Sequence, residues 1–181
     1  VRDAEQFERA EVLRDKGTNR ARFFRGEIDK YTWVDVGSSF LMSELTAAFL
    51  LAQLRRMDEI TADRLASYAR YTQRLQRLAS AGFVELPTVP ADCSHNAHMF
   101  TIRVDAAIRP DLLQHLKDHG VNATFHYVPL HDSPAGRRFG RTHGDCAVTS
   151  AQSLRLVRLP MYYGLRPDEV AKVCDLVSAF F

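Results

Sequence analysis

The sequence predicts a mixed α+β or α/β fold, in which a small α+β domain follows a group of helices. Three patterns lead to this prediction: an apolar helix over 43–54, a long amphipathic helix over 57–82, and a region over 83–181 with the order strand, helix, strand, loop, helix. With 181 residues, 46% of them hydrophobic, the chain is long enough to bury one sizeable core. We therefore expect three parts: residues 1–56, a connecting helix over 57–82, and a C-terminal domain over 83–181.

The first part begins with apolar residues at helical spacing, which predict a helix over about 3–15 that Gly17 ends with a positive φ. Residues 18–39 are rich in arginine, aromatic side chains and glycine without a regular period, so we expect a long loop that serves a function or a partner. Ser43 is a good N-cap for the next helix. That helix is apolar on almost every side, and we expect it to be buried.

The helical pattern after Met57 continues for about 24 residues and stops at Gly82, which suits a spine between two domains. Residues 99–104 alternate as a half-buried strand, a short helix follows Arg109, and the last helix begins near Pro167. Residues 121–128 alternate as a second strand. Its polar face carries Asn122, Thr124 and His126, and such a face could line a cleft.

The net charge of +2 is too small to predict binding to nucleic acid or to a membrane surface. No apolar run approaches the roughly 18 residues that span a bilayer, and the three cysteines show no close pairing. These features favour a reduced, cytoplasmic setting. Cys93, His95 and His98 lack a fourth ligand, so no metal site is expected. Phosphate-binding loops and dinucleotide fingerprints are likewise missing from the sequence.

Two runs of arginines suit a pyrophosphate, because guanidinium groups bind phosphate oxygens in pairs. Solvated loop arginines are an equally good reading of both runs. The first run is Arg20, Arg22 and Arg25, and the second is Arg137, Arg138 and Arg141.

Two longer segments resemble a known family. These are KGTNRARFFRGEIDKYTWVDVGSSFLMSELTAAFLLAQL over 16–54 and NATFHYVPLHDSPAG over 122–136. They resemble the C-terminal half of the DegT/DnrJ/EryC1/StrS-type sugar aminotransferases, which use pyridoxal 5'-phosphate (PLP), and most closely the branch that aminates a dTDP-4-keto-6-deoxyhexose. The resemblance implies the small C-terminal domain of a fold-type I aminotransferase, with the last helices of the large PLP-binding domain attached.

The resemblance also implies an activity. Such an enzyme moves an amino group from glutamate, through PLP, to C4 of dTDP-4-keto-6-deoxyglucose for a surface polysaccharide such as lipopolysaccharide or enterobacterial common antigen. It implies a homodimer whose active sites are shared between subunits, with a dTDP-sugar as substrate. Neither the stereochemistry at C4 nor the choice between dTDP and UDP follows from the residues.

Particular residues acquire roles by the same resemblance. Ser38 and Ser39 occupy the place from which relatives reach the PLP phosphate of the other subunit, although Ser39 stands where the family usually has asparagine. The resemblance implies substrate binding by His126, Tyr127 and His131. Arg25 is a substrate-binding candidate from the first arginine run, and Tyr31 is one because a nucleotide base could stack there, although packing or a dimer interface suits it better. An exposed edge-strand position is the alternative for His126.

The family's Schiff-base lysine lies in a Ser-Phe-His-x-x-Lys-like stretch, which this sequence does not contain. Its lysines are Lys16, Lys30, Lys117 and Lys172, and none matches that motif. We therefore expect no catalytic residue in this chain and no activity from the chain alone. Its charged helical opening without a methionine is typical of a fragment. A non-catalytic sugar-nucleotide-binding or regulatory protein and an inert truncated fragment are the two alternatives.

Overall fold

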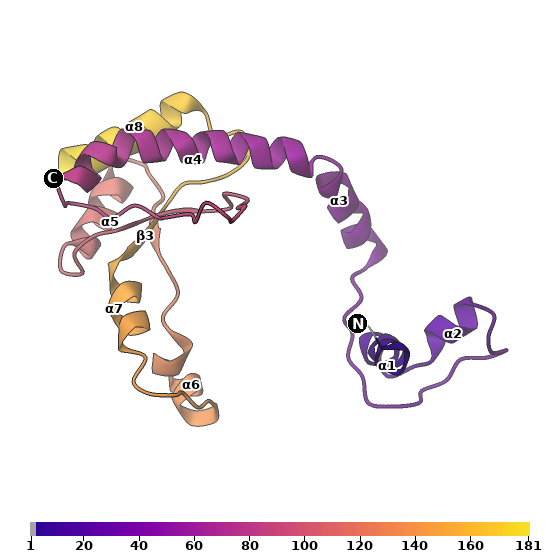
Figure 1. Ribbon diagram of the computed structural model, residues 1–181. Helices are drawn as coiled ribbons and strands as arrows, with labels where there is room; N and C mark the ends of the chain where they lie inside the picture. Colours follow the sequence, from indigo (N-terminus) through magenta and orange to yellow (C-terminus); the bar gives the residue numbers. More distant parts are fainter. Residues whose placement is uncertain (1–2) are drawn as a thin grey trace. The chain divides into compact units, whose positions relative to one another are not determined.

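The computed structural model describes residues 3–181, which form two compact units that divide between Arg56 and Met57. Figure 1 traces the chain through both units. Among the described residues, no helix is long and apolar enough to cross a membrane. Each unit has its own internal packing and is described separately.

The first unit contains three helices: α1, Ala4–Arg14, α2, Arg20–Phe24, and α3, Glu44–Leu54. Asp3 caps α1 by accepting a hydrogen bond from the backbone of Gln6. The prediction that Gly17 follows this helix with a positive φ is confirmed, at 77°.

The loop between α2 and α3 is tied to the end of α1 by backbone hydrogen bonds. Ser38 donates to Leu13 at 2.9 Å, Lys16 donates to Ser38 at 3.0 Å, and Val34 donates to Gly17 at 2.8 Å. A Cβ on Gly17 would lie 1.7 Å from the backbone oxygen of Asp35, so glycine is required by space as well as by φ. The segment expected as a loop therefore contains α2 and is ordered within its own unit.

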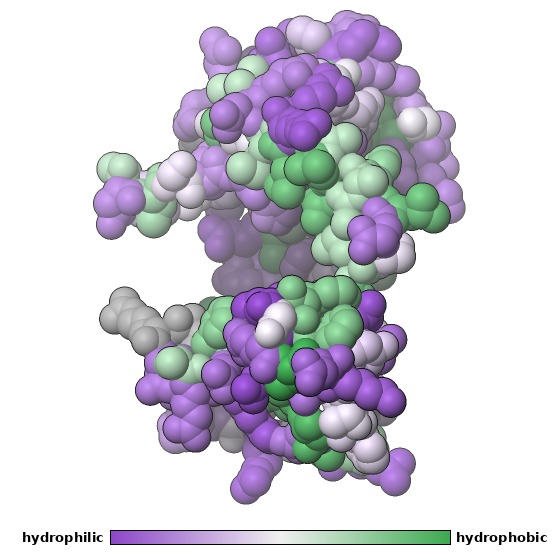
Figure 2. Space-filling view, turned by 90° about the vertical axis from the view of Figure 1, so that its right-hand side faces the viewer, coloured by the Kyte–Doolittle hydropathy of each residue, from purple (hydrophilic) through white to green (hydrophobic). Residues whose placement is uncertain are grey.

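The capping prediction for α3 is confirmed, because the Ser43 hydroxyl accepts a hydrogen bond from the backbone of Thr46 at 3.2 Å. The prediction that α3 is buried is wrong for this chain. None of its residues is buried, and Leu45 and Phe49 are 86% and 70% exposed. Figure 2 shows apolar residues, in green, exposed among the polar ones at the surface. Within its own unit, α3 therefore contributes no side chain to a buried core.

The second unit is built on a three-stranded antiparallel sheet in the order β1-β3-β2. The strands are β1, Phe100–Arg103, β2, Thr124–Phe125, and β3, Leu156–Leu159. The expected strand over 121–128 is therefore mostly extended loop with two paired residues. The middle strand, β3, was not predicted from the sequence, because only four residues separate the preceding helix from Pro160.

Helices pack on the apolar side of this sheet. They are α4, Met57–Ser80, α5, Arg109–Asp118, and α8, Pro167–Phe180, and Figure 1 shows α4 and α8 side by side. The Tyr71 hydroxyl in α4 donates to the backbone oxygen of Pro160, 2.9 Å away, which joins α4 to the segment after β3. The fully buried side chains that form the core include Tyr71, Leu75, Phe100, Ile102, Leu112, Leu116, Val157, Val170 and Val177.

A long connection between β2 and β3 lies outside the core of the second unit. It contains the 3₁₀ turn η1, Leu130–Asp132, and two helices, α6, Pro134–Phe139, and α7, Ala147–Arg155. None of these three has a buried residue, and Figure 1 shows them extending away from the α4 and α8 layer. The sequence-based order over 83–181 omitted them, since their short polar turns carry no clear apolar period.

Candidate functional site

Arg25 lies directly after α2 and is held by two carboxylates. Its Nη1 lies 2.8 Å from both carboxylate oxygens of Glu11, and its Nε donates to Glu27 at 2.6 Å. The hydrogen bonds that Arg25 donates to Glu27 and then to Glu11 raise the pKa of Arg25, and the bond from Arg25 lowers the pKa of Glu27. A diphosphate would have to displace these carboxylates from the guanidinium. Pyrophosphate binding by Arg25 therefore stays a prediction, and the two ion pairs oppose it.

Tyr31 belongs to an aromatic cluster of the same unit. Its ring meets Phe23 edge-on at 5.6 Å, and the Arg20 guanidinium lies 5.7 Å from its centre. The side chain is 44% exposed. Part of the Tyr31 ring is therefore open to a ligand. The rest of the ring packs against Phe23, in agreement with the packing role that was the alternative for this residue.

A cavity of about 350 Å³ lies between α1, α2 and the backbone near Val34. Four carboxylates and two guanidinium groups line it, so its net charge does not favour a diphosphate. The charged lining residues are Glu5, Glu8, Arg9, Glu11, Arg22 and Asp35.

Ser38 and Ser39 lie where the loop turns towards α3, and both are exposed. The backbone N–H of Ser38 is already bound to Leu13, so only its hydroxyl is available to a ligand. The hydroxyl of Ser43 is engaged in capping α3, and Glu44 in the first turn disfavours an anion at that helix end. The hydroxyls of Ser38 and Ser39 therefore fit the role of donors to a phosphate, whereas the N-terminus of α3 does not.

His126 and Tyr127 follow β2 directly. Their rings pack edge-on at 5.2 Å, and Tyr127 is 74% exposed. His126 is partly buried, and its Nδ1 has no hydrogen-bond partner among the described residues. Phe125, which points away from Thr124 and His126, is 52% exposed because β2 is the short edge strand of the sheet.

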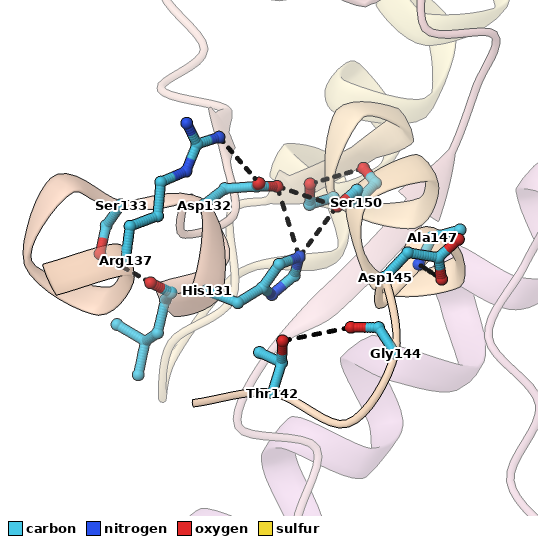
Figure 3. A network of polar contacts seen from close by, with 11 residues as sticks. His131, Asp132, Ser133, Arg137, Thr142, Gly144, Asp145, Ala147 and Ser150 are labelled. Atoms are coloured by element: carbon cyan, nitrogen blue, oxygen red, sulfur yellow. Dashed lines mark hydrogen bonds and ion pairs between the residues drawn. The ribbon is translucent and has the colours of Figure 1, made fainter. Parts of the chain in front are cut away.

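His131 lies in η1 at the centre of a hydrogen-bonded network, shown in Figure 3. Its Nε2 lies 3.0 Å from the Ser150 hydroxyl, which itself donates to Asp132 at 2.8 Å. The Arg137 guanidinium donates to the other oxygen of Asp132 at 3.2 Å. The bond from Ser150 and then the bond from Arg137 lower the pKa of Asp132. The network joins η1 and α6 to α7.

The direction of these hydrogen bonds sets the state of the imidazole. Because the Ser150 proton goes to Asp132, the hydroxyl oxygen must accept from His131, and Nε2 carries a hydrogen. A neutral His131 then presents Nδ1 as an acceptor. The arrangement holds the ring in one orientation and leaves one nitrogen free to accept a proton or a hydrogen bond.

The site residues thus fall into three groups along the chain. Arg25 and Tyr31 lie in the α2 region, Ser38 and Ser39 precede α3, and a third group follows β2. The third group is His126, Tyr127 and His131. The described residues contain no cluster that could hold a metal ion, including the region of Cys93, His95 and His98.

Sequence reasoning missed the partners that hold the third group. Asp132 and Ser150 position His131, and Arg158 of β3 lies against Tyr127. Asp132 could have been noticed because it follows His131 directly. Ser150 and Arg158 are brought close only by α7 and by the pairing of β2 with β3, neither of which the sequence pattern revealed.

Comparison with known proteins finds one family. The model of the DegT/DnrJ/EryC1/StrS aminotransferase family matches residues 1–178. The dTDP-3-amino-3,4,6-trideoxy-alpha-D-glucose transaminase of Streptomyces venezuelae is 28% identical over 97% of this chain, which corresponds to 43% of that relative. The dTDP-4-dehydro-2,3,6-trideoxy-D-glucose 4-aminotransferase of Saccharopolyspora spinosa is 27% identical over 78% of this chain and 35% of its own length.

A solved structure gives the same result for the fold. The crystal structure of S. venezuelae DesV, in complex with a ketimine intermediate, superimposes with a TM-score of 0.80 at 28% identity, covering 98% of this chain and 44% of that protein. The expected relation to PLP-dependent aminotransferases is therefore confirmed at the level of the fold. The chain spans less than half the length of these relatives.

Proposed function

Because the chain belongs to the DegT/DnrJ/EryC1/StrS aminotransferase family, we propose that it forms the C-terminal part of a PLP-dependent sugar-nucleotide aminotransferase. The observation that carries the proposal is the family match over residues 1–178 with dTDP-sugar transaminases among the relatives. The proposed reaction moves an amino group from glutamate to C4 of dTDP-4-keto-6-deoxyglucose, within surface polysaccharide synthesis in the cytoplasm. The C4 position is supported by the Saccharopolyspora relative, and C3, from the Streptomyces relative, is the alternative.

The enzymes of this family depend on PLP. When bound, PLP supplies the electron sink for the transfer. In the proposal, the exposed hydroxyls of Ser38 and Ser39 donate to its phosphate across a homodimer. The exposed hydroxyl donors of these two serines suit an anion better than the acid-lined cavity beside α1 does.

The third group is proposed to hold the sugar nucleotide. His131 offers a fixed imidazole whose Nδ1 accepts a hydrogen bond from a sugar hydroxyl, because Ser150 and Asp132 orient its other nitrogen. His126 and the exposed ring of Tyr127, which pack against each other, are proposed to provide a polar edge and an aromatic face for the same substrate. These residues bind and orient, and none is assigned the covalent step.

The lysines support the proposal that this chain is inactive alone. Lys16, Lys30, Lys117 and Lys172 are all exposed, and an amine that forms a Schiff base needs a desolvated or otherwise activated setting. The same observation favours the second candidate function, a sugar-nucleotide-binding protein without catalysis. An experiment that supplies the part of the fold carrying the Schiff-base lysine distinguishes these two candidate functions, because only an aminotransferase part should then become active.

The test joins residues 1–181 to the N-terminal part of the Streptomyces relative and measures amination of dTDP-4-keto-6-deoxyglucose with glutamate and PLP. We expect glutamate-dependent amination by the joined protein and none by the 181-residue chain. The control replaces the Schiff-base lysine of the added part with alanine, which should abolish the reaction. A folded joined protein that binds PLP but aminates neither a 4-keto nor a 3-keto sugar nucleotide would contradict the proposal.

A further inference from the structure

Arg158 lies at the middle of the sheet, on the face opposite the core. Its neighbours in β3, Val157 and Leu159, are buried, with exposed fractions of 0% and 3%. The register pairs Arg158 with Thr101 of β1 and with Thr124 of β2. Since paired residues of adjacent strands point to the same side, two threonine hydroxyls flank this guanidinium on one polar row.

The arginine is fixed in place without being neutralised. Its Nε donates to the backbone oxygen of Phe125 at 3.2 Å, and its guanidinium carbon lies 5.7 Å from the centre of the Tyr127 ring. Among the described residues no carboxylate pairs with it. Its terminal nitrogens are therefore open donors on a guanidinium that is already oriented.

Two other arginines beside the sheet show the contrast. Arg103 lies 2.7 Å and Arg155 lies 2.5 Å from the carboxylate of Glu85, and the bond from Arg155 is the main cause that lowers the Glu85 pKa. Arg25 is likewise engaged by Glu11 and Glu27. Of these four guanidinium groups, only Arg158 has its charge uncompensated by an acid.

A second observation comes from the histidine that packs against Tyr127. The Nδ1 of His126 is buried and has no hydrogen-bond partner among the described residues, and the ring lies 5.2 Å from Tyr127. A buried polar atom without a partner needs an explanation, and a ligand that completes the site supplies one. The unpaired guanidinium of Arg158 and the unsatisfied imidazole of His126 both lie against the ring of Tyr127.

We propose that Arg158, with Thr101, Thr124 and His126, forms an anion site that binds the diphosphate of the nucleotide sugar. A diphosphate offers several oxygens to a two-pronged guanidinium and to flanking hydroxyls, which matches a row of donors better than a single carboxylate does. The inference deepens the proposed function and rests on it. It moves the pyrophosphate contact from Arg25, whose donors are occupied, to Arg158, whose donors are open.

The test is calorimetric titration of the 181-residue chain and its variants with dTDP, inorganic pyrophosphate, pyridoxine 5'-phosphate and L-glutamate. We expect Arg158→Gln to weaken binding of dTDP and pyrophosphate by about 10-fold or more, the effect of a lost charged hydrogen bond. Arg158→Lys keeps the positive charge but loses the two parallel donors of the guanidinium, so its affinity for dTDP and pyrophosphate should lie between those of the parent and Arg158→Gln. Arg103→Gln, on the same face but paired with Glu85, is the matched control and should bind as the parent does.

Nuclear magnetic resonance separates binding from a merely structural effect of Arg158. Pyrophosphate should shift the imidazole signals of His126 in the parent chain, and this shift should be lost in Arg158→Gln while the ligand-free amide spectrum around β2 is retained. A loss of that spectrum would show a structural role and overturn the assignment. So would dTDP binding that is absent from the parent or unchanged in Arg158→Gln.

The other probes decide the source of the anion. Pyridoxine 5'-phosphate bound in place of dTDP would assign the site to the cofactor, and L-glutamate bound in its place would make it a carboxylate site; either result overturns the inference. Because these titrations do not depend on turnover, they are independent of the amination assay. A joined protein that aminates while Arg158→Gln binds dTDP normally would refute this inference and leave the proposed function intact.

Discussion

At the scale of single residues, hydrogen-bond partners fix the orientation of side chains that the sequence alone marks as candidates for the site. His131 is a clear case, because its usefulness depends on Ser150 holding one ring nitrogen and on Asp132 accepting the Ser150 proton. The Asp132 carboxylate is in turn fixed by Arg137. A histidine with one nitrogen assigned in this way has a defined acceptor, whereas an isolated surface histidine does not.

Ser150→Ala tests this network. Ser150 is the first cause of the lowered pKa of Asp132, so its removal should raise that pKa towards the ordinary range of an aspartate, as measured by carbon NMR of the carboxyl group against pH. The depressed pKa adds stability above the unfolded-state value, and this contribution disappears as the pH falls through the folded value. The parent and the variant should therefore differ in stability at neutral pH and converge in acid.

Ser153→Ala is the control for that experiment, since within residues 3–181 its hydroxyl donates to the backbone oxygen of Ser150 and makes no bond to Asp132. An Asp132 pKa that is equal in Ser150→Ala and in the parent would contradict the network.

The three cysteines should differ in reactivity. Burial raises the pKa of the Cys174 thiol to about 12, while Cys93 is exposed. Because the thiolate is the reactive form, iodoacetamide at pH 8 should label Cys93 and leave Cys174 unmodified until the chain is unfolded with urea. Peptide mapping by mass spectrometry reads both sites, and equal labelling of Cys174 and Cys93 in the folded chain would contradict the buried position.

At the scale of elements, the long periodic segments could be predicted and the short ones could not. The helix after Met57 and the last helix from Pro167 are where apolar spacing places them. By contrast, β3, α6 and α7 are too short to show a period, and their positions are decided by tertiary pairing. The same limit applies to the site: His126, Tyr127 and His131 stood out in the sequence, whereas Ser150 and Arg158 depend on these missed elements.

Leu75→Ala tests the α4 contribution to the core. Leu75 is fully buried, so we expect a loss of about 2–5 kcal/mol in the free energy of unfolding, from lost transfer energy and the cavity left behind. Urea denaturation followed by circular dichroism measures the change. Gln76→Ala, one position along the same helix and exposed, should change the free energy by less than about 0.5 kcal/mol. Similar losses in both variants would contradict the core position of Leu75.

The exposed apolar surface of α3 leads to a prediction about self-association. Leu45 and Phe49 together present two large side chains that are 86% and 70% exposed, and such surfaces drive association. Replacing both with glutamate should shift the 181-residue chain towards a monomer in sedimentation velocity. Gln53→Glu, which adds charge to the same helix without removing an apolar group, is the control. An identical size distribution for all three proteins would show that α3 drives no association.

At the scale of the whole molecule, the chain has the fold of part of an aminotransferase and lacks the family's lysine motif. It matches the family model over 1–178 but spans 43% of the Streptomyces transaminase. The exposure of α3 and of Ser38 and Ser39 is consistent with a surface that the remainder of that fold completes. In the proposed function, this chain binds and orients the substrate, and residues outside it carry out the covalent chemistry.

Intact-mass spectrometry after borohydride reduction in the presence of PLP shows whether this chain carries the lysine that binds the cofactor. The 181-residue chain should keep its mass of 20.5 kDa, and the joined protein should gain the mass of one reduced PLP on the lysine of the added part. A stoichiometric adduct on Lys16, Lys30, Lys117 or Lys172 of the 181-residue chain, lost when that lysine is replaced, would contradict the account. It would place the Schiff-base residue within this chain.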